Sequence, residues 1–464
     1  MTDILNIQRI DYRRDDLHAE VAAIRKRIGL RGDVVSEAGK QRTMEVFGQP
    51  LTPQQVVQTI CDAVRSDGIA AVLKYTEQID KVKVDRDALR VSAKQLETAH
   101  RQADDAFLQA LRAIRKNLVA FQQAIRHEDV SVEVTGGGLL QQRYRPLRRV
   151  GLCIPGGAAA YPSTVLMTAV PAQVAGVEQI AIVAPPTPFG TENVDLLATC
   201  HELGITEVYR AGGAQGVAAL AYGVDGIPAV DLIAGPGNLF VALAKRYVFG
   251  EVAIDAIAGP SEVVVIADAS TPREFVAADL IAQAEHAPGA SILITTCEEL
   301  WDALPGELSQ MCSRLPRGAL ARESLEEFGA LILVPHAGAA ADLANAIAPE
   351  HLQIATVDAA THLDDYHNAG AVFLGPYSPV ALGDYVAGPS HVLPTGGTAR
   401  FASGLSANDF LRSYGVIHFE QGATAAAAPF LKQLAEREGL TAHYLSVDLR
   451  CRQQERSGDE QHGP

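Results

Sequence analysis

The sequence lacks several patterns that would point directly to a class of protein. Its six cysteines lie far apart and form no Cys-x-x-Cys pair, which excludes a cysteine-rich zinc site and a thioredoxin-type motif. Aromatic residues make up only 6% of the chain, with one tryptophan, while alanine, valine and glycine are abundant. This composition favours tightly packed α/β layers over a β-sandwich.

Membrane-spanning and nucleic-acid-binding features are also missing. No apolar run approaches the roughly 20 residues that a transmembrane helix needs. The N-terminus is charged and has no apolar segment of a secretory signal. The net charge of −16 would repel a phosphate backbone. We therefore expect a cytoplasmic protein with reduced thiols that binds neither nucleic acid nor a membrane.

The periodicity of apolar residues predicts an α/β fold. Residues 1 to about 130 are expected to be mostly helical, and a Gly136-Gly137-Gly138 run then predicts a hairpin. From Arg149 onward, short apolar runs alternate with helical segments, which indicates parallel strands joined by crossover helices. The strands are expected near residues 150–155, 179–185, 207–212, 231–235, 262–268, 291–296, 331–335, 352–358 and 371–375. This number exceeds one typical sheet, so two α/β domains with ligands between them are expected. Residues 422–439 predict a further helix.

Three glycine-rich turns follow predicted strands: Gly156-Gly157, Gly212-Gly213 and Gly235-Pro236-Gly237-Asn238. Ligands of open α/β sheets collect at such strand ends, and helix N-termini favour phosphate. None of the turns is a G-x-G-x-x-G fingerprint, and each alone is equally consistent with a tight βα turn. Three in succession make a nucleotide or dinucleotide site a reasonable hypothesis.

Several polar residues could carry chemistry. Gln283 and His286 lie three residues apart at a predicted helix end, where they could hold a metal or simply cap the helix. Glu350 and His351 are adjacent at the start of an apolar run, which suits acid–base catalysis or a solvated loop pair. Asp384 lies in a Gly/Pro-rich stretch that also contains His391, and could bind a metal or cap a turn.

His443 lies well past the α/β part, where a histidine is more often structural. With Gln283, His286 and Asp384 it would supply two imidazoles, a carboxylate and an amide oxygen, a donor set that suits a catalytic zinc site. Spacing alone does not show that these four side chains converge.

Across nearly its whole length the chain resembles histidinol dehydrogenases. The resemblance is carried by long blocks in the family's order, which are residues 151–177, 212–223, 234–268, 279–289, 348–352, 368–401 and 438–443. It implies two incomplete Rossmann-like domains, one inserted in the other, with helical N- and C-terminal extensions. The implied segments are an N-terminal helical arm (1–45), a first α/β domain with the zinc and catalytic residues (46–149 with 259–402), an inserted NAD-contacting domain (150–258), and a C-terminal helical arm reaching the partner subunit (403–464).

The resemblance also implies residue roles. Glu350 and His351 match the family's proton-transfer pair. The zinc ligands, one ion per subunit, would be Gln283, His286, Asp384 and His443. The substrate contacts would be Ser261, Gln283, His286, His351, Asp384, Glu438 and His443. The NAD contacts fall on Cys153, Gln215 and Asn238, and the position of Cys153 is a tyrosine in many members, which bears on the aromatic contact with the cofactor.

The implied activity is the zinc-dependent oxidation of L-histidinol through L-histidinal to L-histidine with two NAD, the last steps of histidine biosynthesis. The family's enzymes are homodimers whose C-terminal arms cross to the partner, so Glu438 and His443 would complete the neighbouring site. Two alternatives remain at this point: a dehydrogenase of the same fold acting on another small polar alcohol, such as a sulfonated diol, and a metal- or nucleotide-binding protein without catalysis.

Overall fold

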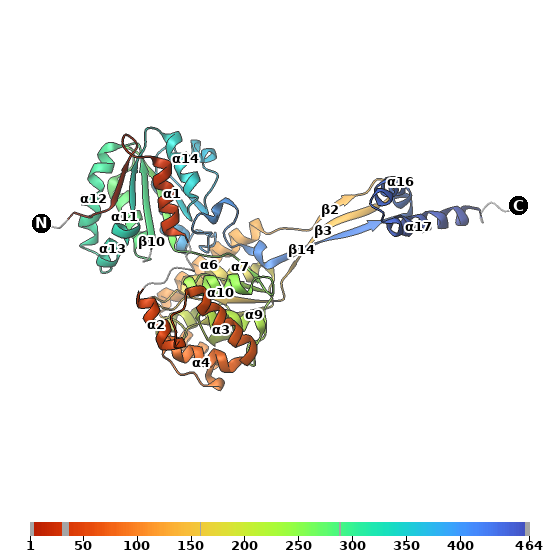
Figure 1. Cartoon of the computed structure of the whole chain (residues 1–464), viewed down its shortest axis with the longest axis horizontal. Coiled ribbons are helices and arrows are strands. Elements are labelled where there is room, and N and C mark those ends of the chain that lie inside the picture. The colour runs from red at the N-terminus through yellow and green to blue at the C-terminus, as the bar shows by residue number, and fades with distance from the viewer. Residues whose placement is uncertain (1–3, 30–36, 158, 287–288, 460–464) are drawn as a thin grey trace. The chain divides into compact units, whose positions relative to one another are not determined.

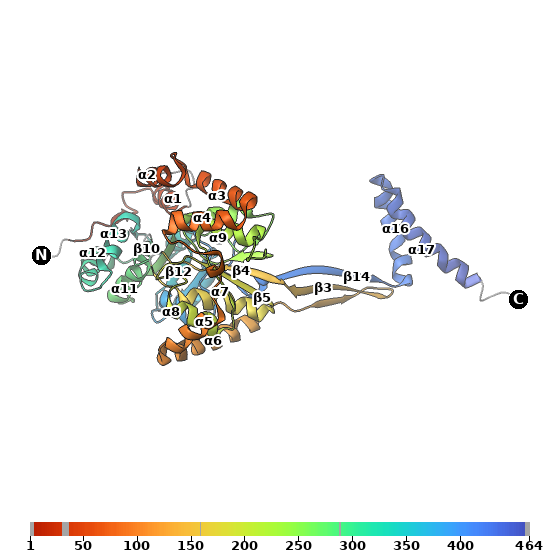
Figure 2. The same ribbon diagram turned by 90° about the horizontal axis from the view of Figure 1, so that it is seen from below.

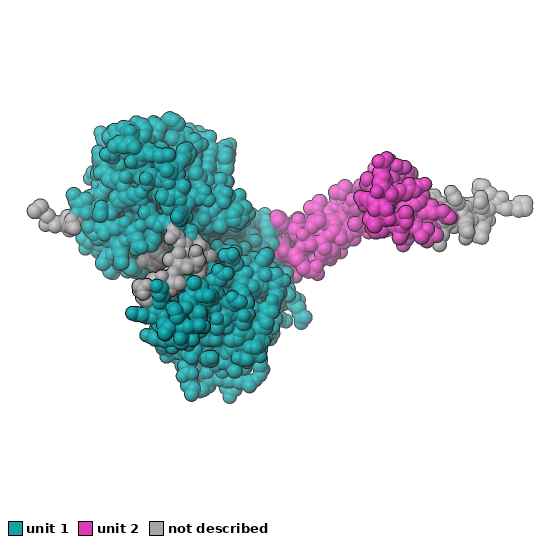
Figure 3. Space-filling model, viewed as in Figure 1, with its two compact units in different colours: residues 1–125, 147–410 teal, residues 126–146, 411–464 magenta. Residues whose placement is uncertain are grey.

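The computed structural model describes residues 4–29, 37–157, 159–286 and 289–459. They form two compact units, one of residues 1–125 and 147–410 and the other of residues 126–146 and 411–464 (Figure 3). The larger unit contains two parallel sheets with helices on both faces (Figure 1), and the smaller unit contains an antiparallel sheet and two helices. The predicted α/β fold with parallel sheets is thus confirmed.

The six-stranded sheet has the order β1-β11-β10-β9-β12-β13, and all its pairs are parallel. Alternate residues of β9 point to opposite faces: Val263 and Val265 pack with α11, α12 and α13, while Val264 and Ile266 pack with α1 and α14. Figure 1 shows these two sets of helices on opposite sides of the sheet. The strands are β1 (Gln8–Asp11), β9 (Ser261–Ala267), β10 (Gly289–Thr295), β11 (Ala330–Leu333), β12 (His351–Ile354) and β13 (Ala371–Leu374). The helices are α1 (Leu17–Ile28), α11 (Arg273–Ala284), α12 (Glu298–Cys312), α13 (Gly318–Phe328), α14 (Ala337–Ile347) and α15 (Val380–Tyr385).

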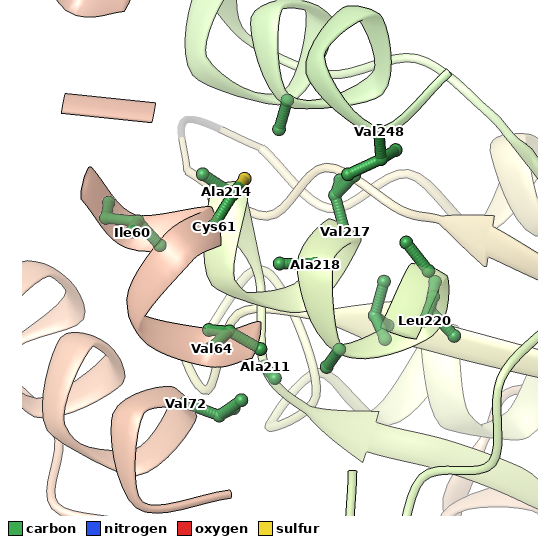
Figure 4. Close-up of a cluster of buried hydrophobic side chains, with 14 of the residues drawn as sticks. Ile60, Cys61, Val64, Val72, Ala211, Ala214, Val217, Ala218, Leu220 and Val248 are labelled. Atoms are coloured by element: carbon green, nitrogen blue, oxygen red, sulfur yellow. The ribbon is translucent and has the colours of Figure 1, made fainter. Parts of the chain in front are cut away.

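The five-stranded sheet has the order β6-β5-β4-β7-β8 and is also parallel. Helices α3, α4, α9 and α10 share an apolar core on one face (Figure 4), and α5 to α8 lie on the other (Figure 2). The strands are β4 (Arg149–Cys153), β5 (Gln179–Ala184), β6 (Glu207–Arg210), β7 (Leu232–Ala234) and β8 (Ala253–Ile254). The helices are α2 (Glu37–Phe47), α3 (Pro53–Asp67), α4 (Ile69–Asp80), α5 (Ala93–Gln102), α6 (Asp105–Ile125), α7 (Pro162–Ala175), α8 (Val194–Glu202), α9 (Gly213–Tyr222) and α10 (Leu239–Val248).

The packing differs from the expected segment assignment in several places, and residues 126–146, expected in the first α/β domain, belong to the smaller unit. Residues 8–11, expected in a helical arm, form β1 and pair with β11 at the edge of the six-stranded sheet. Helices α3 to α6 were expected with residues 259–402, yet their apolar residues pack on the five-stranded sheet and its helices. The physical reason is that Ile60, Cys61 and Val64 of α3 bury their side chains against α9 and α10 (Figure 4).

The smaller unit is built on the sheet β14-β3-β2, whose pairs are antiparallel. The predicted hairpin at Gly136-Gly137-Gly138 joins β2 (Val130–Glu133) to β3 (Gly138–Pro146), and all three glycines have positive φ. Strand β14 (Leu411–Phe419) runs the full length of β3, so the C-terminal arm is not purely helical. Two helices follow, α16 (Gln421–Arg437) and α17 (Thr441–Asp459).

Short 3₁₀ turns are found at Arg86–Ala88, Ala359–Thr361, Leu363–Asp365, Thr398–Arg400 and Ala407–Phe410. Among the helices of the described residues, none is both long enough and apolar enough to cross a bilayer.

Candidate active site

Glu350 and His351 are fixed at the amino end of β12. Helix α14 ends at Ile347, and Ala348 takes a left-handed conformation with φ of 52°, which turns the chain into the strand. The N–H of Ala371 donates to the Glu350 carbonyl at 2.9 Å, and a Cβ on Gly370 would lie 2.6 Å from that carbonyl oxygen. The backbone around the pair is therefore tightly constrained.

A chain of hydrogen bonds holds the Glu350 carboxyl. Strand β12 pairs with β9, which brings Ser261, the first residue of β9, beside Glu350. The Ser261 hydroxyl donates to Glu350 Oε2 at 2.5 Å, and the Gln283 amide Nε2 donates to Ser261 Oγ at 2.7 Å. The backbone N–H of Glu262 adds a bond of 3.1 Å to Glu350 Oε2. Three of the sequence-predicted residues, Ser261, Gln283 and Glu350, thus form one connected group.

Glu262 lies behind this group with no exposed surface. Its Oε1 accepts the N–H of Glu350 at 3.2 Å and of Gly396 at 2.8 Å, while its Oε2 is buried without a partner among the described residues. Burial raises the pKa of Glu262 to about 8. Burial also raises the pKa of Glu350 well above its ordinary value, and repulsion from Glu262 raises it further. Sequence reasoning missed Glu262, although a glutamate opening the apolar run EVVVIAD was a visible signal.

His351 is buried between two carboxyl groups. Its Nδ1 is 3.7 Å from Glu350 Oε2 and its Nε2 is 3.7 Å from Asp384 Oδ1. Burial lowers the pKa of His351 to about 3, and the neighbouring imidazoles of His286 and His391 lower it further. The Nδ1 has no hydrogen-bond partner among the described residues. The ring is therefore neutral near pH 7, with a lone pair free to accept a proton.

Asp384 is held by its backbone. It lies on the short helix α15, and its carbonyl oxygen is 2.9 Å from His391 Nδ1, whose Nε2 is 3.3 Å from the hydroxyl of Thr164 on α7. Burial raises the pKa of Asp384 to about 6 and lowers the pKa of His391 to about 4. His391 thus links the Asp384 backbone to a helix that packs on the five-stranded sheet.

His286 lies just beyond the C-terminal end of α11. Its N–H donates to the Gln283 carbonyl at 3.2 Å, so the two side chains leave the same helix end as predicted. The ring is exposed in the single chain, yet the surrounding protein desolvates it enough to lower its pKa, and Arg317 adds to this effect. Its charge acts on both His351 and His391, so the three imidazoles share one region.

The donor set available for a metal in the larger unit consists of Gln283, His286 and Asp384. Because the Gln283 nitrogen is committed to Ser261, its amide oxygen is the atom left to face a cation. No group of three His, Cys, Asp or Glu side chains close enough to hold a metal exists in the described part of one chain. Two such side chains and an amide fit zinc only if a further ligand comes from elsewhere, as the expected arm exchange would provide.

The three residues expected to contact NAD lie at the carboxyl end of the five-stranded sheet. Cys153 ends β4 and is buried, and burial raises its pKa to about 12. Gln215, in the first turn of α9, is also buried, and its Nε2 donates to Asp80 at 3.3 Å while its Oε1 has no partner among the described residues. Asn238 is exposed and caps α10 by accepting the N–H groups of Phe240 and Val241.

Glu438 and His443 belong to the smaller unit. Glu438 follows the last residue of α16 and His443 lies in the first turn of α17, and both side chains are exposed. The two residues are therefore accessible to a ligand or to another chain.

Comparison with known proteins identifies the family. The family model described as histidinol dehydrogenase matches residues 49–451. The chain is 55% identical over 449 residues to a histidinol dehydrogenase of Rhodopirellula baltica, covering 96% of this chain and 97% of the relative, and 47% identical over 395 residues to one of Moorella thermoacetica, covering 85% and 93%. A crystal structure of histidinol dehydrogenase from Elizabethkingia anophelis superposes with a TM-score of 0.87 at 32% identity, covering 98% of this chain and 100% of that one. The chain therefore belongs to the histidinol dehydrogenase family of NAD-dependent oxidoreductases.

Proposed function

We propose that this chain oxidises L-histidinol through L-histidinal to L-histidine, reducing two NAD, at the site built on Glu350 and His351. The observation that carries the proposal is the buried carboxyl–imidazole pair, joined to Gln283 through Ser261 and facing Asp384. The relatives are histidinol dehydrogenases, which indicates the substrate, and the pair supplies groups able to move the protons that the reaction releases.

In the first half-reaction, neutral His351 accepts the hydroxyl proton of the alcohol while the carbinol carbon loses a hydride to NAD. Burial keeps the imidazole uncharged, so the lone pair is available before the substrate arrives. The products of this step are the aldehyde, NADH and a proton held on His351. The aldehyde stays in the site because the second oxidation uses the same carbon.

In the second half-reaction, Glu350 accepts a proton from a water molecule that adds to the aldehyde carbon, while His351 returns its proton to the carbonyl oxygen, which yields the hydrate and a neutral imidazole. The hydrate then loses a hydride to a second NAD while His351 accepts the hydroxyl proton, which yields the carboxylic acid. Burial and Glu262 raise the pKa of Glu350, so its carboxylate is a stronger base than an exposed one. The Ser261 and Glu262 hydrogen bonds aim Oε2 and leave the other carboxyl oxygen for the water.

We infer that Gln283, His286, Asp384 and the partner's His443 hold one zinc ion, and that Ser261 and Glu438 contact the substrate with those ligands. Bound there, zinc would polarise and orient the substrate's imidazole and amino groups beside His351. Asp384 would be ionised beside a cation despite its raised pKa, because a nearby positive charge favours the carboxylate.

The smaller unit supports a homodimer in which this arm contacts a second copy. Large apolar side chains stay exposed on its sheet and helices: Ile417 is 78% exposed, Phe430 77% and Leu434 65%. A three-stranded sheet with two helices has too little core to bury them, and an isologous partner would cover them. Six unpaired cysteines agree with a reducing compartment, which supports a cytoplasmic location.

The test is NADH formation from L-histidinol by the purified, zinc-loaded protein. We expect two NADH per histidinol, and little NADH from a sulfonated diol offered at the same concentration. Zinc-loaded protein that is inert toward histidinol would contradict the proposal. Preference for the diol would reassign the substrate while keeping the fold and the dehydrogenase chemistry.

A further inference from the structure

Lys245 and Asp255 form an ion pair in the interior of the larger unit. Lys245 lies on α10 and is 1% exposed, and Asp255 directly follows β8. Their Nζ and Oδ1 atoms are 2.5 Å apart, and their side chains are 2% and 4% exposed. Burying two charges is unfavourable unless the geometry is good and other hydrogen bonds are made. The pair therefore calls for an account of what else it binds.

Both partners bind the same residue, Gly235. Asp255 Oδ2 accepts the Gly235 N–H at 2.7 Å, and Lys245 Nζ donates to the Gly235 carbonyl at 2.9 Å. Gly235 has a φ of 111°, and a Cβ there would lie 2.4 Å from the carbonyl oxygen of Cys153. Both backbone polar groups of Gly235, at the end of β7, are thus hydrogen-bonded to the ion pair. The residue has a conformation that residues other than glycine rarely adopt.

Gly235 is the first residue of the loop Gly235-Pro236-Gly237-Asn238. The loop ends at Asn238, the exposed residue that caps α10. A Cβ on Gly237 would come within 2.4 Å of Val241, so the loop packs closely against the helix as well. Helix α10 is itself fixed by packing on α3 and α9 through residues such as Val248 (Figure 4). The loop therefore has little freedom, and its first residue is the one that Lys245 and Asp255 hold.

We propose that Lys245 and Asp255 are positioning residues for the cofactor. Their hydrogen bonds to Gly235 hold this residue against the carbonyl of Cys153 and thereby fix the loop that carries Asn238. Neither side chain is expected to reach NAD itself, because both are buried and hydrogen-bonded to the backbone of Gly235. This inference rests on the proposed NAD-linked function. The two residues would maintain the conformation of the NAD-contacting surface, and they take no part in the chemistry at Glu350 and His351.

The experiment compares Lys245→Met and Asp255→Asn with a matched variant, Arg149→Met. Arg149 is buried and forms another ion pair in the same sheet, with the half-buried Glu207 at 2.7 Å, but at the amino end of β4, the opposite end from Cys153. Both methionine variants leave a carboxylate without its cationic partner, so both should lower the melting temperature. Asp255→Asn is the milder change, because its amide oxygen can still accept the Gly235 N–H.

Binding of NAD is measured by calorimetry well below each variant's melting temperature, together with the KM values for NAD and for histidinol. We expect Lys245→Met to raise the Kd and KM for NAD about tenfold or more while the KM for histidinol and the zinc content stay unchanged. Asp255→Asn should give a smaller rise, and Arg149→Met should bind NAD as wild type does.

Wild-type NAD affinity in both Lys245→Met and Asp255→Asn would overturn the proposal, and so would an equal loss of affinity in Arg149→Met. If wild-type protein reduces NAD with histidinol while Lys245→Met and Asp255→Asn bind NAD with unchanged affinity, only this inference is refuted. Wild-type protein that neither binds nor reduces NAD would refute the proposed function too.

Discussion

Replacing Glu262 with glutamine should change how the stability of the protein depends on pH. The carboxyl has a pKa of about 8 in the folded chain and an ordinary value of 4.5. Folding at pH 7 therefore requires the uptake of nearly one proton, which costs about 3 kcal/mol. The sign follows from the raised pKa: this penalty is absent below pH 4.5, grows as the pH rises and is complete above pH 8.

Glutamine keeps the oxygen that accepts the N–H groups of Glu350 and Gly396 but takes up no proton. Its amide nitrogen would replace the unpartnered Oε2, at a pH-independent cost of about 1–3 kcal/mol. The net change at pH 7 is therefore small, and the informative quantity is the slope. Between pH 5 and 8, the free energy of unfolding of wild type should fall relative to Glu262→Gln by up to about 1.4 kcal/mol per pH unit.

The assay is urea or thermal unfolding of both proteins across this pH range, with Glu323→Gln on the exposed side of α13 as the control for loss of a surface charge. A second readout is the acidic limb of the pH–rate profile for histidinal oxidation. It should move to lower pH in Glu262→Gln, because repulsion from Glu262 helps to raise the pKa of Glu350. Parallel stability curves for wild type and variant would show that folding takes up no proton at Glu262 and would refute this reasoning.

Three further predictions concern the proposed chemistry. His351→Asn should depress both half-reactions, whereas Glu350→Gln should depress mainly histidinal oxidation, each by about 100-fold or more; equal losses in both steps for both variants would reject this division of roles. A chelator should abolish activity and zinc should restore it, and activity in protein with no bound metal would rule out the metal role. When Glu350→Gln and His443→Asn chains are unfolded together and refolded, half of the dimers should be hybrids with one intact site. The mixture should therefore recover about a quarter of wild-type activity, and no recovery would contradict arm exchange.

The strands that sequence reasoning found are those with a continuous apolar pattern. All nine predicted runs are strands of the two parallel sheets, because a strand covered by helices on both faces is largely apolar. The missed strands lack this signal. Strand β1 reads QRID and lies at a sheet edge, β8 has two residues, and β14 is largely exposed along its length.

The assembly of the site could not be read from spacing. Ser261 and Glu350 are 89 residues apart, and they meet because β12 pairs with β9 although β10 and β11 come between them in sequence. Strand order depends on long-range packing and cannot be predicted from a local pattern of residues. The site also lies at the amino ends of β9 and β12, whereas the general rule for open α/β sheets points to carboxyl ends.

The cysteines bear on how the aldehyde can be oxidised. A cysteine route needs a thiolate at the aldehyde carbon, and thiolates form where the pKa is lowered. Here burial raises the pKa of Cys61, Cys153 and Cys200 to about 12, and that of Cys312 also rises.

With the arm placed as proposed, the two remaining thiols are also badly placed for that role. Cys297 follows the carboxyl end of β10, whereas Ser261 lies at the amino end of the neighbouring β9. Both strands have seven residues, so these two ends are about 20 Å apart. Cys451 lies on α17 about two helical turns beyond His443. In the proposed mechanism the hydrogen-bonded carboxyl of Glu350 deprotonates the nucleophile, and with no thiolate at the site that nucleophile is water. The second oxidation should therefore pass through a hydrate, which explains why an enzyme that oxidises the same carbon twice would keep a carboxyl of raised pKa beside a neutral imidazole.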